Sequence, residues 1–250
     1  KEYQIKSKVV VNATGVFVDD VMKMDECDTR RKVRPSQGVH LVVDSKFLGG
    51  RSALMIPKTK DGRVLFGVPW HGKVVLGTTD TPLNEASLEP RALEEEVDFI
   101  LDQAGQYLDR KPTRADVLSI FAGLRPLAAP THADSKKTKE ISRNHKIYRS
   151  KSGLLTITGG KWTTYRAMAE DVINQAIVIG GLSPAECVTK NLRVHGYTKE
   201  QFDENDWNYV YGSDADKIQK MIEKEPSFAE KLYEGYTFTA AHVVWAAREE

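Results

Sequence analysis

The sequence predicts an α/β fold with mixed sheets, followed by a small all-α C-terminal unit. Short runs of β-branched and other apolar residues, bounded by Gly, Asp and Lys, dominate the first 160 residues and are typical of strands. Apolar residues recur at helical spacing in residues 91–108 and again after the glycine pair at 159–160. After about residue 185 helix formers predominate. The periodic apolar residues of this last part are Ile218, Met221, Ile222, Val243, Val244 and Ala247.

Composition excludes several classes of protein. The 250 residues are 40% apolar, enough to bury a sizeable core. A formal charge of +1 does not provide the basic field that sequence-independent nucleic-acid binding needs. Cys27 and Cys187 lie far apart and form no C-x-x-C pair, so we expect free thiols and no metal site.

Location follows from the apolar runs. None reaches the roughly 18 residues of a membrane-spanning helix, and no signal peptide opens the chain. We therefore expect a cytoplasmic location, with the inner face of the cytoplasmic membrane as the alternative.

The first residues predict a strand and a tight turn. Val9, Val10 and Val11 form a β-branched run that leads through Asn12 into "ATG", residues 13–15. Such a run predicts a strand buried on both faces, as in a parallel sheet. Cofactors bind in crevices at the ends of such strands, although a compact turn also explains the triplet.

An antiparallel meander and a covering helix are expected next. The strand-like runs are "GVHLVVD", "SALMIPKT", "RVLFGVPW" and "KVVLGTTDT", with "DGR" and "HGK" as hairpin turns. Residues 91–108 predict a helix that covers the sheet. Its apolar face consists of Leu93, Val97, Ile100, Leu101, Ala104, Tyr107 and Leu108. Two more strands are expected around a Ser-Gly turn in "RNHKIYRSKSGLLTITGG".

The segment "TITGGKWTTYRAMAEDVIN", residues 156–174, begins as a strand, breaks at two glycines and continues as a helix that opens with Lys161. Glycines allow a ligand to approach the backbone, and a helix start offers N–H groups and partial positive charge. A lysine there opposes the helix dipole, which favours a functional explanation. A glycine turn beside a solvent-facing lysine is the structural alternative.

Two polar residues interrupt apolar strands. Arg125 lies in "IFAGLRPLAAP" before Pro126, which favours an extended backbone, and an arginine in such a strand is usually paired or functional. His40 lies in "GVHLVVD". Taken alone, a histidine of this kind is usually a packed structural residue.

In their order, six motifs resemble those of the FAD-dependent glycerol-3-phosphate dehydrogenase family. They are "VVNATGVFVDDV", "GVHLVVD", "LGTTDT", "GLRPL", "SRNHKI" and "GGKWTTYRAMAED". The resemblance covers residues 1–250 and is strongest before residue 180. It implies FAD as cofactor and oxidation of sn-glycerol 3-phosphate to dihydroxyacetone phosphate, with hydride transfer from C2 to flavin N5.

The resemblance also implies a domain organisation. We expect residues 1–30 and 151–185 to form the C-terminal part of an FAD-binding domain. Residues 31–150 would form a mixed-sheet substrate-binding domain covered by helices, and residues 190–250 a truncated helical domain. The sequence contains no G-x-G-x-x-G motif of the family's N-terminal half, so we expect a C-terminal portion that is inactive and binds FAD weakly by itself.

Cofactor-binding residues follow from the resemblance. It places Ala13, Thr14 and Gly15 beside FAD, and a second segment at the helix start that faces the pyrimidine edge of the flavin. That second segment consists of Gly159, Gly160, Lys161, Trp162 and Thr163. Lys161 would stabilise the negative charge of the reduced flavin. Family members often have a smaller residue than Trp162 at its position.

Substrate contacts and catalysis are assigned in the same way. Arg125 and Arg143 match arginines of the substrate pocket, where guanidinium groups suit a phosphate dianion. His40 matches a histidine near the reacting face of the flavin and would take the proton of the C2 hydroxyl, or else only shape the pocket. The catalytic residues expected are His40, Arg125 and Lys161. The substrate-binding residues expected are Arg125, Arg143 and Lys161, and no residue is assigned to a metal.

Other functions share part of this pattern. FAD-dependent amine and amino-acid oxidoreductases have a similar "ATG" and glycine turn, but one arginine suffices to bind their carboxylate, so two arginines favour phosphate. A non-catalytic fragment is a further alternative. We expect quinone as the electron acceptor, with oxygen, as in an oxidase, as the alternative. A peripheral membrane contact and a homodimer complete the expected partners, and nucleic acid is not among them.

Overall fold

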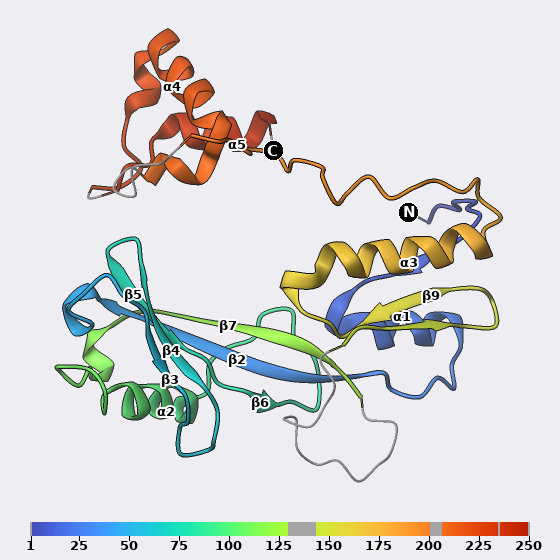
Figure 1. The fold of residues 1–250 in the computed structure, drawn as a ribbon, viewed down its shortest axis with the longest axis horizontal. Coiled ribbons are helices and arrows are strands. Elements are labelled where there is room, and N and C mark those ends of the chain that lie inside the picture. The colour runs from blue at the N-terminus through green and yellow to red at the C-terminus, as the bar shows by residue number, and fades with distance from the viewer. Residues whose placement is uncertain (1, 130–143, 201–206, 235, 250) are drawn as a thin grey trace. The chain divides into compact units, whose positions relative to one another are not determined.

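The computed structural model describes residues 2–129, 144–200, 207–234 and 236–249, and it has the mixed α/β architecture that the sequence predicts (Figure 1). Two compact units are present, Lys1–Cys187 and Val188–Glu250. The strands are β1 (Val11–Asn12), β2 (Val33–Asp44), β3 (Leu54–Ile56), β4 (Leu65–Trp70), β5 (Lys73–Gly77), β6 (Thr81–Pro82), β7 (Val117–Ala128), β8 (Lys146–Arg149) and β9 (Leu155–Thr158). The α-helices are α1 (Val18–Asp25), α2 (Glu94–Ala104), α3 (Tyr165–Ile179), α4 (Ala215–Lys224) and α5 (Ala240–Glu249).

The larger sheet of the first unit is antiparallel and is built around β2. Its strand order is β3-β4-β5-β2-β6, and β7 also pairs with β2 (Figure 1). The β4–β5 hairpin turns at His71 and Gly72, whose φ angles are +46° and +70°. Positive φ at both central residues is what a tight hairpin turn requires, so the turn predicted from "HGK" is confirmed.

Helix α2 covers one face of this sheet. Its buried apolar residues pack against alternate strand residues such as Leu41 and Leu76. The helix is shorter than the predicted range 91–108, because it ends at Gly105, whose N–H bonds to the carbonyl of Leu101. Tyr107 therefore lies beyond the helix and is exposed rather than buried on its face. Since side chains alternate along a strand, the other face of β2 carries His40.

The smaller sheet has the order β1-β9-β8, with β1 parallel to β9 and β8 antiparallel to β9. The hairpin between β8 and β9 confirms the two strands predicted around a Ser-Gly turn, with Gly153 at φ +98°. Helix α3 packs Val172 and Ala176 against the buried residues of β9. Val10 is 54% exposed, so the first run is not buried on both faces as predicted. Val10 precedes β1 and lines a surface pocket.

The second unit is helical in the residues described. Ile218 of α4 and Ala241 and Trp245 of α5 form its core. Helix α5 does not use the predicted apolar face, because Val243 is 54% exposed. The bulky indole of Trp245, one turn from Ala241, takes that role instead. Within the ranges described, no helix of either unit is both long and apolar enough to cross a bilayer.

Candidate active site

Two of the predicted motifs leave the same edge of the smaller sheet. Strand β1 runs into residues 13–15 and β9 runs into residues 159–161. These strands are parallel neighbours, with Asn12 opposite Thr156, so both motifs lie at the carboxyl ends of their strands. Open α/β sheets bind ligands at this edge.

Asn12 ties this edge together, although the sequence analysis did not assign it a role. Its Nδ2 donates to the carbonyl of Val18 at 2.9 Å and to Oγ1 of Thr156 at 3.2 Å. The Thr14 hydroxyl donates to Asn12 Oδ1 at 2.8 Å. Asn12 thus fixes the "ATG" turn relative to α1 and β9. Its position as the polar residue that closes an apolar strand is the signal that could have revealed it.

The glycine pair after β9 is required by the backbone. Gly159 and Gly160 have φ angles of +76° and +80°, a region that favours glycine. A Cβ at Gly159 would lie 2.8 Å from the carbonyl oxygen of Asn144, and one at Gly160 would lie 2.4 Å from the sulfur of Met168. The glycine turn that the sequence left as a structural alternative is therefore real, and it directs the next three residues into solvent.

Those next residues do not yet belong to the α-helix. Trp162–Thr164 form a 3₁₀ turn and α3 begins at Tyr165, so Lys161 precedes the helix by one short turn. The Thr164 hydroxyl donates to the carbonyl of Lys161 at 3.0 Å and holds this turn. Trp162 is 86% exposed and stacks on Tyr165 with ring centroids 5.5 Å apart. An exposed aromatic pair, an exposed lysine and the first N–H groups of a helix suit a planar, electron-rich ring such as the edge of a flavin.

His40 lies on the face of the larger sheet that α2 does not cover. Its ring stacks on Phe121 with centroids 5.0 Å apart and an interplanar angle of 12°. Its other neighbour is Gly77, where a Cβ would lie 2.4 Å from His40 Cδ2. Burial and then the positive charge of Arg125 lower the pKa of His40 below its ordinary value of 6.5. The imidazole is therefore neutral at pH 7 and can accept a proton.

Arg125 is held flat against the same face. Its Nη1 donates to the carbonyl of Thr79 at 3.1 Å, and its Nη2 donates to Oγ1 of Thr78 at 2.9 Å. Asp80 Oδ1 lies 3.8 Å from Nη1. The guanidinium lies directly over Gly38, where a Cβ would be 2.3 Å from Nη2. The segment "LGTTDT" was noted in the sequence as a motif, but its role in holding Arg125 was missed.

The structure gathers the predicted residues into two groups. One is the pair of motifs at the edge of the smaller sheet, and the other is His40 with Arg125. The end of β7, three residues beyond Arg125, approaches the first group, because a Cβ at Gly159 would lie 3.6 Å from Cβ of Ala128. Arg143 lies outside the described residues. Just after it in the sequence, His145 Nε2 lies 2.7 Å from Asp171 Oδ2 and so ties the start of β8 to α3.

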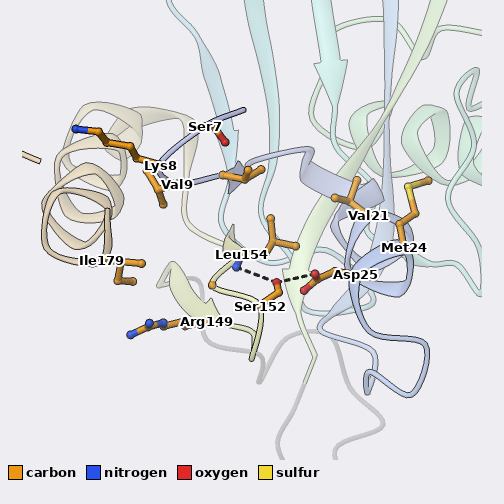
Figure 2. A pocket seen from close by; sticks show the side chains of 12 residues that line it. Ser7, Lys8, Val9, Val21, Met24, Asp25, Arg149, Ser152, Leu154 and Ile179 are labelled. Carbon is orange, nitrogen blue, oxygen red and sulfur yellow. Dashed lines mark hydrogen bonds between the residues drawn. The ribbon is translucent and has the colours of Figure 1, made fainter. Parts of the chain in front are cut away.

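A separate pocket lies at the opposite, amino ends of β1 and β9 (Figure 2). Its lining is mixed, with apolar residues such as Val9 and Met24 beside the charged residues Lys8, Asp25 and Arg149. Asp25 accepts a hydrogen bond from Ser152 at 2.6 Å, and hydroxyl donors lower the pKa of its carboxyl group. The bond between Ser152 and Asp25 thus fastens the β8–β9 turn to α1, and none of the predicted site residues that the structure describes lines this pocket. In the parts of the chain that the structure describes, no cluster of His, Cys, Asp and Glu is arranged to hold a metal.

The chain matches known proteins over most of its length. Residues 1–166 match the family model described as FAD dependent oxidoreductase. The chain is 40% identical to the mitochondrial glycerol-3-phosphate dehydrogenase of Arabidopsis thaliana, over 100% of the chain and 44% of that protein. It is 44% identical to the mitochondrial enzyme of Bos taurus, over 78% of the chain and 27% of that protein.

A solved structure is similar as well. The glycerol-3-phosphate dehydrogenase of Bacillus halodurans, complexed with FAD, superposes with a TM-score of 0.76 at 31% identity. The match covers 96% of the chain and 49% of that protein. The chain thus spans less than half the length of the relatives that it matches.

Proposed function

The chain belongs to the family of FAD-dependent oxidoreductases, and from this premise we propose that it serves an enzyme that oxidises sn-glycerol 3-phosphate to dihydroxyacetone phosphate. The observation that carries the proposal is the pairing on one sheet face of Arg125 with His40, whose pKa is lowered. A guanidinium group binds the phosphate and a neutral imidazole accepts a proton. The names of the relatives support this choice of substrate.

We propose separate roles for the two sheets. The smaller sheet, formed by residues 1–30 and 151–185 together with β8 just before them, completes an FAD-binding domain, and the larger sheet within residues 31–150 covers the substrate. Residues 190–250 form a separate helical domain. Residues 13–15 and 159–163 would hold one edge of the flavin, to which Lys161 adds positive charge. When bound, FAD supplies the acceptor for the hydride that leaves C2.

The protein's own groups orient the substrate and move its proton. Arg125, together with Arg143, binds the phosphate and fixes the glycerol carbons relative to the sheet face. His40 Nδ1 or Nε2 takes the proton of the C2 hydroxyl as the carbonyl forms. Because its pKa lies below 6.5, His40 needs no prior deprotonation at pH 7.

Anaerobic stopped-flow reduction of the flavin in the full-length protein tests the proposal. Arg125→Leu and Arg143→Leu should each lower the affinity for sn-glycerol 3-phosphate by roughly one to two powers of ten, since a charge-assisted hydrogen bond contributes about 1.5 to 3 kcal/mol. Glycerol, which lacks the phosphate, should be little affected. His40→Ala should slow flavin reduction by roughly 10²-fold or more. A wild-type flavin that sn-glycerol 3-phosphate does not reduce would rule the function out.

We also propose quinone as the electron acceptor. A long-tailed quinone resides in the bilayer, so this acceptor requires the protein to contact a membrane surface. Reoxidation of the reduced flavin by a soluble quinone analogue, compared with oxygen, tests the acceptor, and flotation with liposomes tests the membrane contact. Faster reoxidation by oxygen would favour an oxidase. Sedimentation velocity of the same sample tests the expected homodimer.

A further inference from the structure

Glu96 is a buried carboxylate beneath the site that the proposed reaction does not use. It lies in the first turn of α2 and is 3% exposed. Its Oε1 accepts hydrogen bonds from the hydroxyls of Thr79 at 2.8 Å and Thr81 at 2.6 Å. Its Oε2 accepts from Nε2 of Gln37 at 2.6 Å and from the N–H of Leu93 at 3.0 Å.

This carboxylate is fully ionised at neutral pH. Burial acts to raise the pKa of Glu96, but the hydrogen bonds from Leu93, Thr81, Thr79 and Gln37 outweigh burial and hold that pKa below its ordinary value. The N-terminus of α2 adds partial positive charge. A buried charge is costly unless it is satisfied in this way, so the four donors are fixed strongly around it.

Two of those donors belong to the segment that holds Arg125. The Thr79 hydroxyl, which donates to Glu96, also accepts from the N–H of Val39 in β2 at 3.0 Å. The carbonyl of the same Thr79 accepts from Arg125 Nη1, and its neighbour Thr78 accepts from Nη2. The hydroxyl and the carbonyl of Thr79 therefore connect the carboxylate at the start of α2 to the guanidinium on the other face of the sheet.

We propose that Glu96 is a positioning residue for Arg125. Its carboxylate fixes Thr79, and Thr79 with Thr78 fixes the direction of the guanidinium fork that meets the anionic group of the substrate. The inference rests on the proposed function, which assigns Arg125 to the phosphate. Recognition of phosphate by arginine depends on the direction of its planar fork, so a small rotation of the Thr79 peptide weakens binding without removing the charge.

The test uses variants of the full-length holoenzyme that disturb this link but keep Arg125. Thr79→Val removes the hydroxyl and should raise KM for sn-glycerol 3-phosphate about tenfold while kcat changes little, because a misdirected charge-assisted bond mainly affects binding. The inhibition constant of inorganic phosphate should rise in parallel. Thr79→Ser keeps the hydroxyl and should restore both values. Glu96→Asp keeps the charge but shortens the side chain, and it should also raise KM for sn-glycerol 3-phosphate. It provides the test if Thr79→Val does not fold.

Two controls separate positioning from general loss of stability. Thr59 is also buried, and its hydroxyl bonds to Asp61 and Arg63 within the β3–β4 connection. Thr59→Val should lower Tm as Thr79→Val does but leave KM unchanged. In an Arg125→Leu background, Thr79→Val should no longer change KM.

The outcomes distinguish this inference from its premise. An unchanged KM in both Thr79→Val and Glu96→Asp, or an equal rise in Thr59→Val, would overturn the role of Glu96 while sn-glycerol 3-phosphate still reduced the wild-type flavin. A wild-type enzyme that this substrate does not reduce would remove the proposed function, and the inference would fall with it.

Discussion

At the scale of single residues, two glycines make room for the two functional side chains. The ring of His40 lies against Gly77 and the guanidinium of Arg125 lies against Gly38. In each case a Cβ would come closer than 3.0 Å to the functional group. A methyl group at either position therefore has to displace that functional group, because both glycines lie within paired strands.

Alanine at these glycines should reproduce the loss of the neighbouring side chain. We expect Gly38→Ala to raise KM for sn-glycerol 3-phosphate and Gly77→Ala to slow flavin reduction, each by up to about 10²-fold, as a misplacement of about 1 Å in a site can. Gly123→Ala is the matched control, because Gly123 pairs with Gly38 in the same sheet and has no atom within 4 Å of its added Cβ. Equal effects of all three changes on both constants would contradict this explanation.

The lowered pKa of His40 sets the pH dependence of flavin reduction. Only the neutral imidazole accepts a proton, so the rate should rise with pH through the pKa of His40 and level off above it, with the acid limb below pH 6.5. In Arg125→Leu burial still lowers this pKa but the nearby positive charge is gone, so the limb should move to higher pH. The measurement is stopped-flow flavin reduction at saturating substrate across pH. If His40→Ala keeps the wild-type profile, His40 is not the base.

At the scale of secondary structure elements, the sequence predicts features that depend on neighbouring residues better than features that depend on tertiary contacts. The hairpin at His71 and Gly72 and the glycine pair after β9 follow from turn chemistry, which acts over a few residues. Glu96 is one of three consecutive glutamates at the start of α2. Its burial depends on Gln37 and Thr79, which are distant in sequence, so no local pattern reveals it.

The glycine pair offers a prediction about how one element joins the next. Gly159→Ala should destabilise the first unit by about 1–2 kcal/mol from the left-handed backbone alone, and further through contact with the carbonyl of Asn144. Gly181→Ala isolates the first contribution, since Gly181 has φ +56° and no atom within 4 Å of an added Cβ. Denaturant unfolding of both variants provides the comparison. Equal losses of stability would show that the contact with Asn144 relaxes without cost.

At the scale of the whole molecule, the two compact units have separate hydrophobic cores. The core of the second unit contains Ile218, Ala241 and Trp245, and the cores of the first unit lie under its two sheets. The change from short strand runs to helical spacing indicated such a unit from sequence. The buried face of α5 was predicted wrongly, because valines and an indole compete for one core and only packing decides between them.

The affinity of residues 1–250 alone for FAD depends on which parts of an FAD-binding fold this polypeptide contains. The sequence has no G-x-G-x-x-G motif, which in dinucleotide folds supplies the backbone N–H groups for the pyrophosphate, and the proposed contacts reach only one edge of the flavin. We therefore expect this polypeptide to remain colourless when it is mixed with FAD and passed through gel filtration, whereas the full-length protein retains the flavin absorbance. Residues 13–15 and 159–163 would then orient a flavin that other residues anchor. Stoichiometric yellow protein from residues 1–250 would instead assign the main binding energy to these two segments.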